Sequence, residues 1–224
     1  MDRTGSDAAA KIIDTVLALL ESDGYDAVQL REVARRARVS LTTVYKLYPT
    51  RDALILSAIE HWMATNTYTE MPAPPDDETL RDGLMRMLRY IFEPWERHPR
   101  MLEAYFLVRT GPAAQRLDAQ GFDAVLPSAS SLFANLDPEY IADLGLILTN
   151  MVHALIGRFA TGAIEVTEIL PALDRIIYRL TTNNEPLAAA AHAQKSPPGA
   201  AQTLVLRPSF ISPYDPGPGT TGDA

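Results

Sequence analysis

The spacing of the apolar residues constrains the fold more than any other feature, because they recur every three or four positions along most of the chain. In AAAKIIDTVLALLES, residues 8–22, they fall on one face of a helix. Later segments repeat this period up to about Thr181, and none shows the apolar–polar alternation of a half-exposed strand. The sequence therefore predicts an all-α fold.

Proline and glycine divide this helical pattern into two predicted domains. Three short helices form an N-terminal domain at residues 1–54, and a connecting helix follows at about 51–68. The proline-rich break MPAPPDDE, residues 71–78, leads into a second helical domain at 71–182. Residues 183–224 are rich in Ala, Pro, Gly, Ser and Thr, and we expect them to form a disordered tail.

Composition excludes several classes of function. The chain has no cysteine, and its four histidines are scattered, so neither disulfides nor a metal site is expected. We find no nucleophile–base pair and no phosphate-binding glycine loop, which predicts a protein that is not an enzyme and needs no cofactor. An apolar signal segment and a run of about 18 apolar residues are also missing from the sequence. We therefore expect a cytoplasmic protein with no membrane association.

Charge is unevenly distributed along the chain. The net charge is −8, which argues against nonspecific coating of nucleic acid. Between residues 29 and 51, however, six basic residues stand against Glu32 alone, a local balance of +5. Such a cluster is either a solvated helix face or a surface for a polyanion such as DNA.

The basic cluster coincides with a predicted helix-turn-helix. VQLREVARRARV and LTTVYKLY are separated by about three residues, and Ser40 suits the N-cap of the second helix, which enters the major groove in this motif. Leu41, Val44 and Leu47 would dock that helix. Its outward side chains are Thr and Tyr rather than the Glu–Lys pairs of a solvated helix, which favours contact with bases and phosphates. The candidate DNA-binding residues are Gln29, Arg31, Ser40, Thr42, Thr43, Tyr45, Lys46, Tyr48, Thr50 and Arg51.

The stretch GYDAVQLREVARRARVSLTTVYKLYPTRDALI resembles the DNA-binding segment of the TetR family of bacterial transcriptional repressors. Three positions depart from the family pattern: Gln29 where threonine is frequent, and Arg38 and Thr42 where glycine is frequent. Tyr48 and Arg51 replace phenylalanine and lysine and keep their roles. The resemblance implies the family's mode of DNA binding with a different operator sequence.

The resemblance also implies a second domain that binds a small effector and dimerises through its last two helices. Between Tyr140 and Phe159 the apolar side chains cover more than one helix face, which independently favours burial against a partner. Two groove-reading helices about 34 Å apart also require a two-fold partner. The alternative is a monomeric core. The candidate dimerisation residues are Leu148, Val152, Leu155, Phe159, Leu173, Ile176 and Leu180.

An effector pocket is harder to locate from sequence, because each apolar candidate could equally belong to ordinary core. Asn150 and His153, polar in an apolar helix, would either orient a ligand or form hydrogen bonds across the dimer. The candidate ligand-binding residues are Met85, Leu88, Phe92, Trp95, Met101, Tyr105, Phe122, Leu126, Asn150 and His153.

Two further segments, RHPRMLEAYFLVRTGPAAQRLDAQ and ADLGLILTNMVHALIGRFATG, are similar in order to the actinobacterial repressors of cholesterol catabolism. This similarity implies that the small hydrophobic effector is a lipid or an acyl-CoA thioester. We predict a homodimeric repressor that binds a palindromic operator in double-stranded DNA and is released by that effector. The alternatives are a transcriptional activator and a helical adaptor with a vestigial DNA-binding domain.

Overall fold

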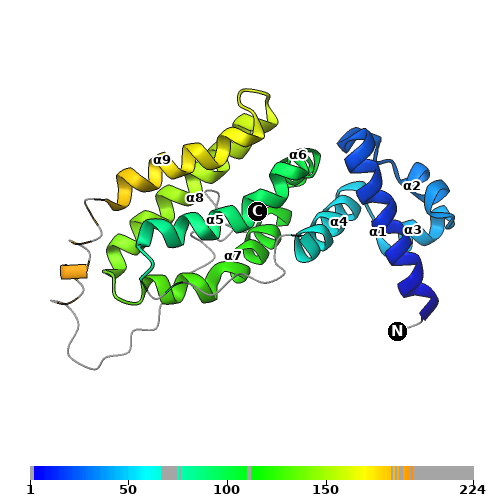
Figure 1. The fold of residues 1–224 in the computed structure, drawn as a ribbon. Helices are drawn as coiled ribbons and strands as arrows, with labels where there is room; N and C mark the ends of the chain where they lie inside the picture. The colour runs from blue at the N-terminus through cyan, green and yellow to red at the C-terminus, as the bar shows by residue number, and fades with distance from the viewer. Residues whose placement is uncertain are drawn as a thin grey trace, which may run out of the picture.

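A computed structural model describes residues 3–66, 77–109 and 112–182, together with residues 75, 184, 186, 189–191 and 193. These residues form helices joined by short turns, with no strand among them, as predicted, and the helices form two lobes (Figure 1). The N-terminal lobe contains α1 (Arg3–Asp23), α2 (Leu30–Ala37), α3 (Leu41–Leu47) and α4 (Arg51–Asn66). The second lobe contains α5 (Leu80–Arg97), α6 (Pro99–Val108), α7 (Pro112–Phe133), α8 (Pro138–Ala160) and α9 (Ile169–Thr181). The predicted tail at 183–224 and residues 67–74 lie almost wholly outside the described residues.

The N-terminal lobe forms around the apolar face of α1. Ile12, Val16 and Leu20 are fully buried there, as the helical spacing of the sequence requires. Gly24 ends α1 with a φ of 84°, and its amide donates to the carbonyls of the last helical turn. Because an L side chain rarely adopts this φ, glycine is suited to turning the chain here toward α2.

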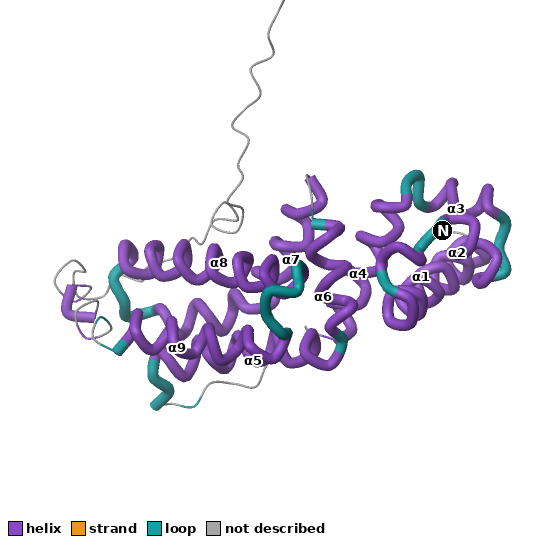
Figure 2. The backbone as a smooth tube through the Cα atoms, turned by 90° about the horizontal axis from the view of Figure 1, so that it is seen from above, coloured by secondary structure: helices purple, strands orange, loops and turns teal. Residues whose placement is uncertain are grey.

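In the second lobe, α5 packs against both α7 and α9. Helix α8 lies alongside α9 (Figure 2). Gly83 of α5 allows a close approach to α7, because a Cβ atom there would lie 2.6 Å from a methyl carbon of Leu132. A second hydrophobic cluster fills this end of the molecule, with Leu80, Leu84, Ile141 and others contributed by four helices.

One hydrophobic core runs from the first lobe into the second. It includes apolar residues of α1 and α4 and continues through α5 and α6 to α8 and the start of α9. At the junction, Trp62 of α4 contacts Trp95 of α5 with 4.3 Å between ring centroids. The connecting helix α4 therefore packs against both lobes. Because of this packing, a displacement of helices in one lobe can be transmitted to the other.

Helix α8 bears on the expectation that the protein has no membrane association. It is 23 residues long, and its most apolar 18-residue window has a mean hydropathy of 1.4, so it is the one helix among the described residues that is long and apolar enough to cross a membrane. It nevertheless contacts α6 and α9 within the helical fold, and core helices of soluble proteins pass the same test. Only 22% of its most apolar window is buried in the single chain, so much of its surface is open.

Candidate nucleic-acid interface and internal cavity

The turn between α2 and α3 is shaped by the three residues that link them. Arg38 adopts a left-handed conformation, with φ 55° and ψ 42°, at the position where glycine was noted as frequent. Ser40 is the N-cap of α3 as predicted: its Oγ accepts from the Thr43 amide at 3.0 Å. The Thr43 hydroxyl lies 2.7 Å from the same Oγ, so these two candidates also stabilise the start of the helix.

Helix α3 is docked by one face and exposes the other. Val44 is fully buried and Leu41 is partly buried, as predicted, whereas Leu47 is 37% exposed and does not act as a docking residue. Thr42, Tyr45 and Lys46 are exposed. The exposed face thus presents a hydroxyl, a phenol and an ammonium, which are groups that donate to base edges and phosphates.

Arg51 makes several contacts within the N-terminal lobe. Its Nε donates to the Val28 carbonyl at 2.6 Å, and its Nη2 donates to the Tyr25 carbonyl at 2.5 Å. The guanidinium also stacks 4.2 Å from the centroid of the Tyr25 ring. These contacts hold the start of α4 against the turn after α1 and give Arg51 a structural role, while its contact with DNA stays a prediction.

Three other candidates also take part in local structure. Gln29 is the N-cap residue of α2 and donates from Nε2 to the Asp26 carbonyl, and Thr50 Oγ1 accepts from the Ala53 amide at the start of α4. Both residues remain exposed. Tyr48 ends α3 and is partly buried, which raises the pKa of its phenol.

The basic cluster separates into paired and unpaired cations. Arg35 and Arg36 each lie 2.6 Å from the Glu32 carboxylate, and their hydrogen bonds lower the pKa of Glu32 to about 2. Within the described part of the chain, Arg31, Arg38 and Lys46 form no ion pair, and all are exposed. Positive charge is therefore free on α2, in the turn and on α3.

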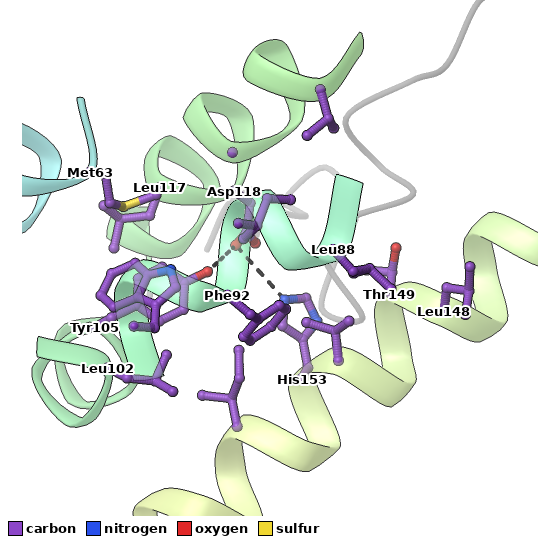
Figure 3. Close-up of a pocket in the computed structure, with 16 residues that line it drawn as sticks. Met63, Leu88, Phe92, Leu102, Tyr105, Leu117, Asp118, Leu148, Thr149 and His153 are labelled. Carbon is purple, nitrogen blue, oxygen red and sulfur yellow. Dashed lines mark hydrogen bonds and ion pairs between the residues drawn. The ribbon is translucent and has the colours of Figure 1, made fainter. Parts of the chain in front are cut away.

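The second lobe contains a partly open cavity of about 220 Å³ (Figure 3). It is bounded by α5, α6, α7 and α8, and α4 closes one side through Met63. Most of the wall is apolar, as in typical small-molecule sites. The lining residues are Met63, Leu88, Ile91, Phe92, Trp95, Leu102, Tyr105, Leu117, Asp118, Gly121, Val125, Leu148, Thr149, Val152, His153 and Ile156.

A buried polar cluster is set into this apolar wall. Asp118 of α7 accepts two hydrogen bonds from Arg109, from Nε and Nη2 at 2.7 Å each, and one from the Tyr105 hydroxyl at 3.2 Å. Nε2 of His153 lies 3.9 Å from the same carboxylate. Figure 3 shows the Tyr105 hydroxyl and the His153 ring directed at Asp118 from different helices.

Burial governs how these groups titrate. Desolvation lowers the pKa of His153 to about 4, and the charge of Arg109 acts in the same direction against that of Asp118. Burial likewise raises the pKa of Tyr105. At neutral pH the imidazole and the phenol are therefore uncharged, and Arg109 balances the Asp118 carboxylate.

Five of the predicted ligand-binding residues line the cavity: Leu88, Phe92, Trp95, Tyr105 and His153. Met85 and Met101 do not line it and are buried in the hydrophobic clusters. Asn150 also lies outside it, exposed, with its side-chain amide donating to the Leu146 carbonyl. The side chains of Phe122 and Leu126 lie outside the described residues.

Sequence reasoning missed Arg109 and Asp118. They lie nine residues apart on either side of the predicted break at Gly111-Pro112, so no helical spacing relates them. Asp118 stands next to Leu117, an apolar neighbour that is also fully buried. No signal in the sequence marks Asp118 as buried, and only its hydrogen bonds with Tyr105 and Arg109 in the folded chain reveal its role.

The predicted dimerisation residues are mostly directed into the chain's own fold. Leu155, Phe159 and Leu173 are buried in the core of the single chain, and Leu148 and Val152 line the cavity. Ile176 and Leu180 are partly buried. Leu155, Phe159 and Leu173 are therefore covered within the single chain, where α8 packs against α6 and α9. The exposed apolar side chains of these helices are instead Leu146, Ile147 and Tyr178.

Comparison with known families identifies both lobes. Residues 12–58 match the model of the bacterial regulatory proteins of the tetR family, and residues 78–180 match the tetracyclin repressor-like C-terminal domain. The chain belongs to the TetR family. These matches confirm the resemblance noted in the helix-turn-helix segment. Members of the family are transcriptional regulators rather than enzymes.

Several relatives of this TetR regulator are named transcriptional repressors or regulators. The HTH-type transcriptional repressor KstR of Rhodococcus jostii is 32% identical over 117 residues, which is 50% of this chain and about half, 53%, of the relative. KstR of Mycolicibacterium smegmatis is 25% identical over 78% of this chain and 87% of the relative. The HTH-type transcriptional regulator EthR of the same species is 24% identical over 93% of this chain and 85% of the relative.

A solved structure supports the fold. The crystal structure of a TetR transcriptional regulator from Rhodococcus sp. RHA1 superimposes with a TM-score of 0.59, covering 78% of this chain and 97% of the other. The two sequences are 18% identical, so the match concerns the arrangement of helices.

Proposed function

We propose that this TetR regulator is a cytoplasmic, homodimeric repressor that binds a palindromic DNA operator and is released by a small hydrophobic effector. The observation that carries the proposal is the exposed face of α3, where Thr42, Tyr45 and Lys46 stand free beside the unpaired Arg31 and Arg38. A solvated surface helix does not need these flat and hydroxyl-bearing side chains. The repressor function is further supported by the KstR relatives.

The open apolar surface of the last two helices supports the proposed dimer. Leu146 and Ile147 of α8 are 51% and 41% exposed, and Tyr178 of α9 is 51% exposed. Soluble proteins seldom leave a long apolar helix so uncovered, and a second copy of the same face would bury it. A two-fold partner also supplies the second groove-reading helix that a palindromic operator requires.

The contacts between the cavity and α4 support the proposed release of the protein from its operator by a ligand. Met63 closes the cavity from α4, and the neighbouring Trp62 packs on Trp95, another lining residue. On the other side, α7 holds Glu60 of α4: Arg116 pairs with its carboxylate at 2.8 Å, and Gln120 donates to its carbonyl at 2.9 Å. A ligand that fits the cavity better in one position of α4 would shift the spacing of the paired α3 helices.

The effector class follows from the apolar lining of the cavity. A volume of about 220 Å³ is below the range of roughly 300–1,000 Å³ that is usual for ligand pockets, which favours a small molecule. An acyl-CoA thioester, implied by the likeness to the repressors of cholesterol catabolism, would need a larger cavity and an outlet for its charged part. It is therefore the second candidate in the test below.

The first experiment is selection of bound duplexes from a random library by the full chain at near-physiological salt. A palindromic consensus is expected. Lys46→Ala should then weaken binding to all sequences and reduce the salt slope by about one unit, because a phosphate contact releases about one counterion. Arg89→Ala, which removes an exposed cation of α5, is the matched control and should change neither.

The same operator allows the regulatory direction to be measured. A reporter placed behind it should be silenced by the regulator, and apolar small molecules or acyl-CoA thioesters should restore expression. Enrichment of no sequence by a folded dimer would contradict the proposed DNA reading, and stimulation of the reporter would make the protein an activator.

A further inference from the structure

One polar group in the cavity wall has no partner. The imidazole of His153 contributes to the lining, and its Nδ1 atom is buried without a hydrogen bond among the described residues. A buried nitrogen that has lost water and gained no partner is unfavourable, so the cavity is incomplete as a polar environment. Tyr105 and Arg109 form hydrogen bonds to Asp118 and not to this atom.

The neighbour of His153 indicates which nitrogen carries the proton. Nε2 faces the Asp118 carboxylate at 3.9 Å. A lone pair directed at a carboxylate is repelled, whereas an N–H dipole is attracted, so the Nε2–H tautomer is favoured. Nδ1 then bears the lone pair, and it can only accept a hydrogen bond.

Charge limits the ligand as well. The Asp118 carboxylate is matched by Arg109, and no further cation lines the cavity in the described part of the chain. Only roughly one molecule in a thousand has His153 in its charged imidazolium form at pH 7, since the pKa of that imidazole is about 4. An anionic group would therefore be buried beside a carboxylate with no countercharge of its own.

The volume of the cavity limits the size of the ligand, as comparison with a known apolar cavity shows. A cavity of about 150 Å³ accommodates benzene, with its six carbon atoms. In proportion, about 220 Å³ accommodates a molecule of about nine non-hydrogen atoms.

We propose that the effector is an uncharged, mainly apolar molecule of this size that donates one hydrogen bond, from a hydroxyl or N–H group, to Nδ1 of His153. Thr149, one helical turn before His153 on the same wall, offers a hydroxyl for a second contact (Figure 3). The inference rests on the proposed function only in naming the molecule an effector, because binding to the cavity can be measured without DNA.

A pair of isomers tests the effect of the hydrogen-bond donor while the size of the ligand stays the same. 4-Ethylphenol and 4-methylanisole share one atomic composition, but only the phenol can donate a hydrogen bond. Titration calorimetry on the full chain without DNA should show 4-ethylphenol binding about tenfold more tightly. 4-Methylbenzoate, of similar size but anionic, should show no measurable binding at pH 7.5.

Two variants assign the preference to one atom. His153→Leu should abolish the difference between the isomers, because no acceptor remains. Asn150→Leu makes the same kind of change on the same helix but outside the cavity, and it should leave the difference intact. Equal affinities for the isomers, tighter binding of the benzoate, or no binding of any probe would overturn the inference. So would a preference that survives in His153→Leu, and if that variant does not fold, the comparison in the natural chain still decides.

The proposed function is tested apart from this chemistry. If 4-ethylphenol binds with the expected preference but leaves the protein on its operator, the ligand inference stands and release by that ligand fails. If the operator is bound and released by other molecules while the isomers bind equally, the proposed function stands and the inference about His153 is wrong.

Discussion

At the scale of single residues, cations of similar appearance in the sequence have different roles. Lys46 is exposed and unpaired on α3, whereas the guanidinium of Arg51 is committed to two backbone carbonyls and an aromatic ring. Both residues belong to the same motif, and composition alone assigns both to DNA. The difference arises because a guanidinium can satisfy two carbonyls at once, which an ammonium in the same place does less well.

Arg51→Ala should lower the free energy of unfolding by about 2 kcal/mol, because two charge-assisted hydrogen bonds and a cation–π contact are lost. Urea unfolding followed by circular dichroism measures this. Lys46→Ala, which removes an exposed and unpaired cation, should change the value by no more than about 0.5 kcal/mol. An Arg51 variant with unchanged stability but weakened DNA binding would contradict this structural role and support the predicted DNA contact.

At the scale of helices, α8 serves two surfaces at once. One face lines the cavity and packs into the core, and the other leaves Leu146 and Ile147 exposed. The amphipathic pattern of the sequence shows that more than one face is apolar, but it cannot show which face turns inward. That choice is made by the packing of α6 and α9 on α8, which buries Leu155 and Phe159.

Leu146→Lys should convert the proposed dimer to a monomer, because a charge would be placed in the centre of the two-fold contact without a partner. Sedimentation velocity at micromolar concentration measures the change. Leu107→Lys is the matched control, since Leu107 is 44% exposed on α6, which is not one of the two helices of the proposed interface, and it should leave the dimer intact. A Leu146 variant that sediments as a dimer would contradict the proposed interface.

At the scale of the whole molecule, the shared core makes the two lobes one mechanical unit. Apolar side chains are continuous from α1 to α9 through α4 and α6. Polar contacts reinforce this junction, because Arg100 of α6 donates to the Glu21 and Ser22 carbonyls at the end of α1. A ligand effect in the second lobe can therefore reach the DNA-binding lobe through packed side chains.

The two lobes should accordingly unfold together. The chain's two tryptophans, Trp62 and Trp95, are both buried at the junction, so their fluorescence reports its opening, while circular dichroism reports all helices. In urea at one fixed protein concentration the two signals should give coincident transitions. A fluorescence transition at clearly lower urea would mean that the lobes separate before they unfold.

The sequence by itself determined the all-α class, the helix-turn-helix with its Ser40 cap, and the exposed groups of α3, because these depend on local spacing and on short-range hydrogen bonds. Tertiary structure alone decided which face of α8 is buried, where Arg51 is held, and that Arg109 and Asp118 meet Tyr105 and His153. Those outcomes depend on contacts between helices distant in the chain. The periodicity of one helix defines its apolar faces but not the neighbour that each face meets.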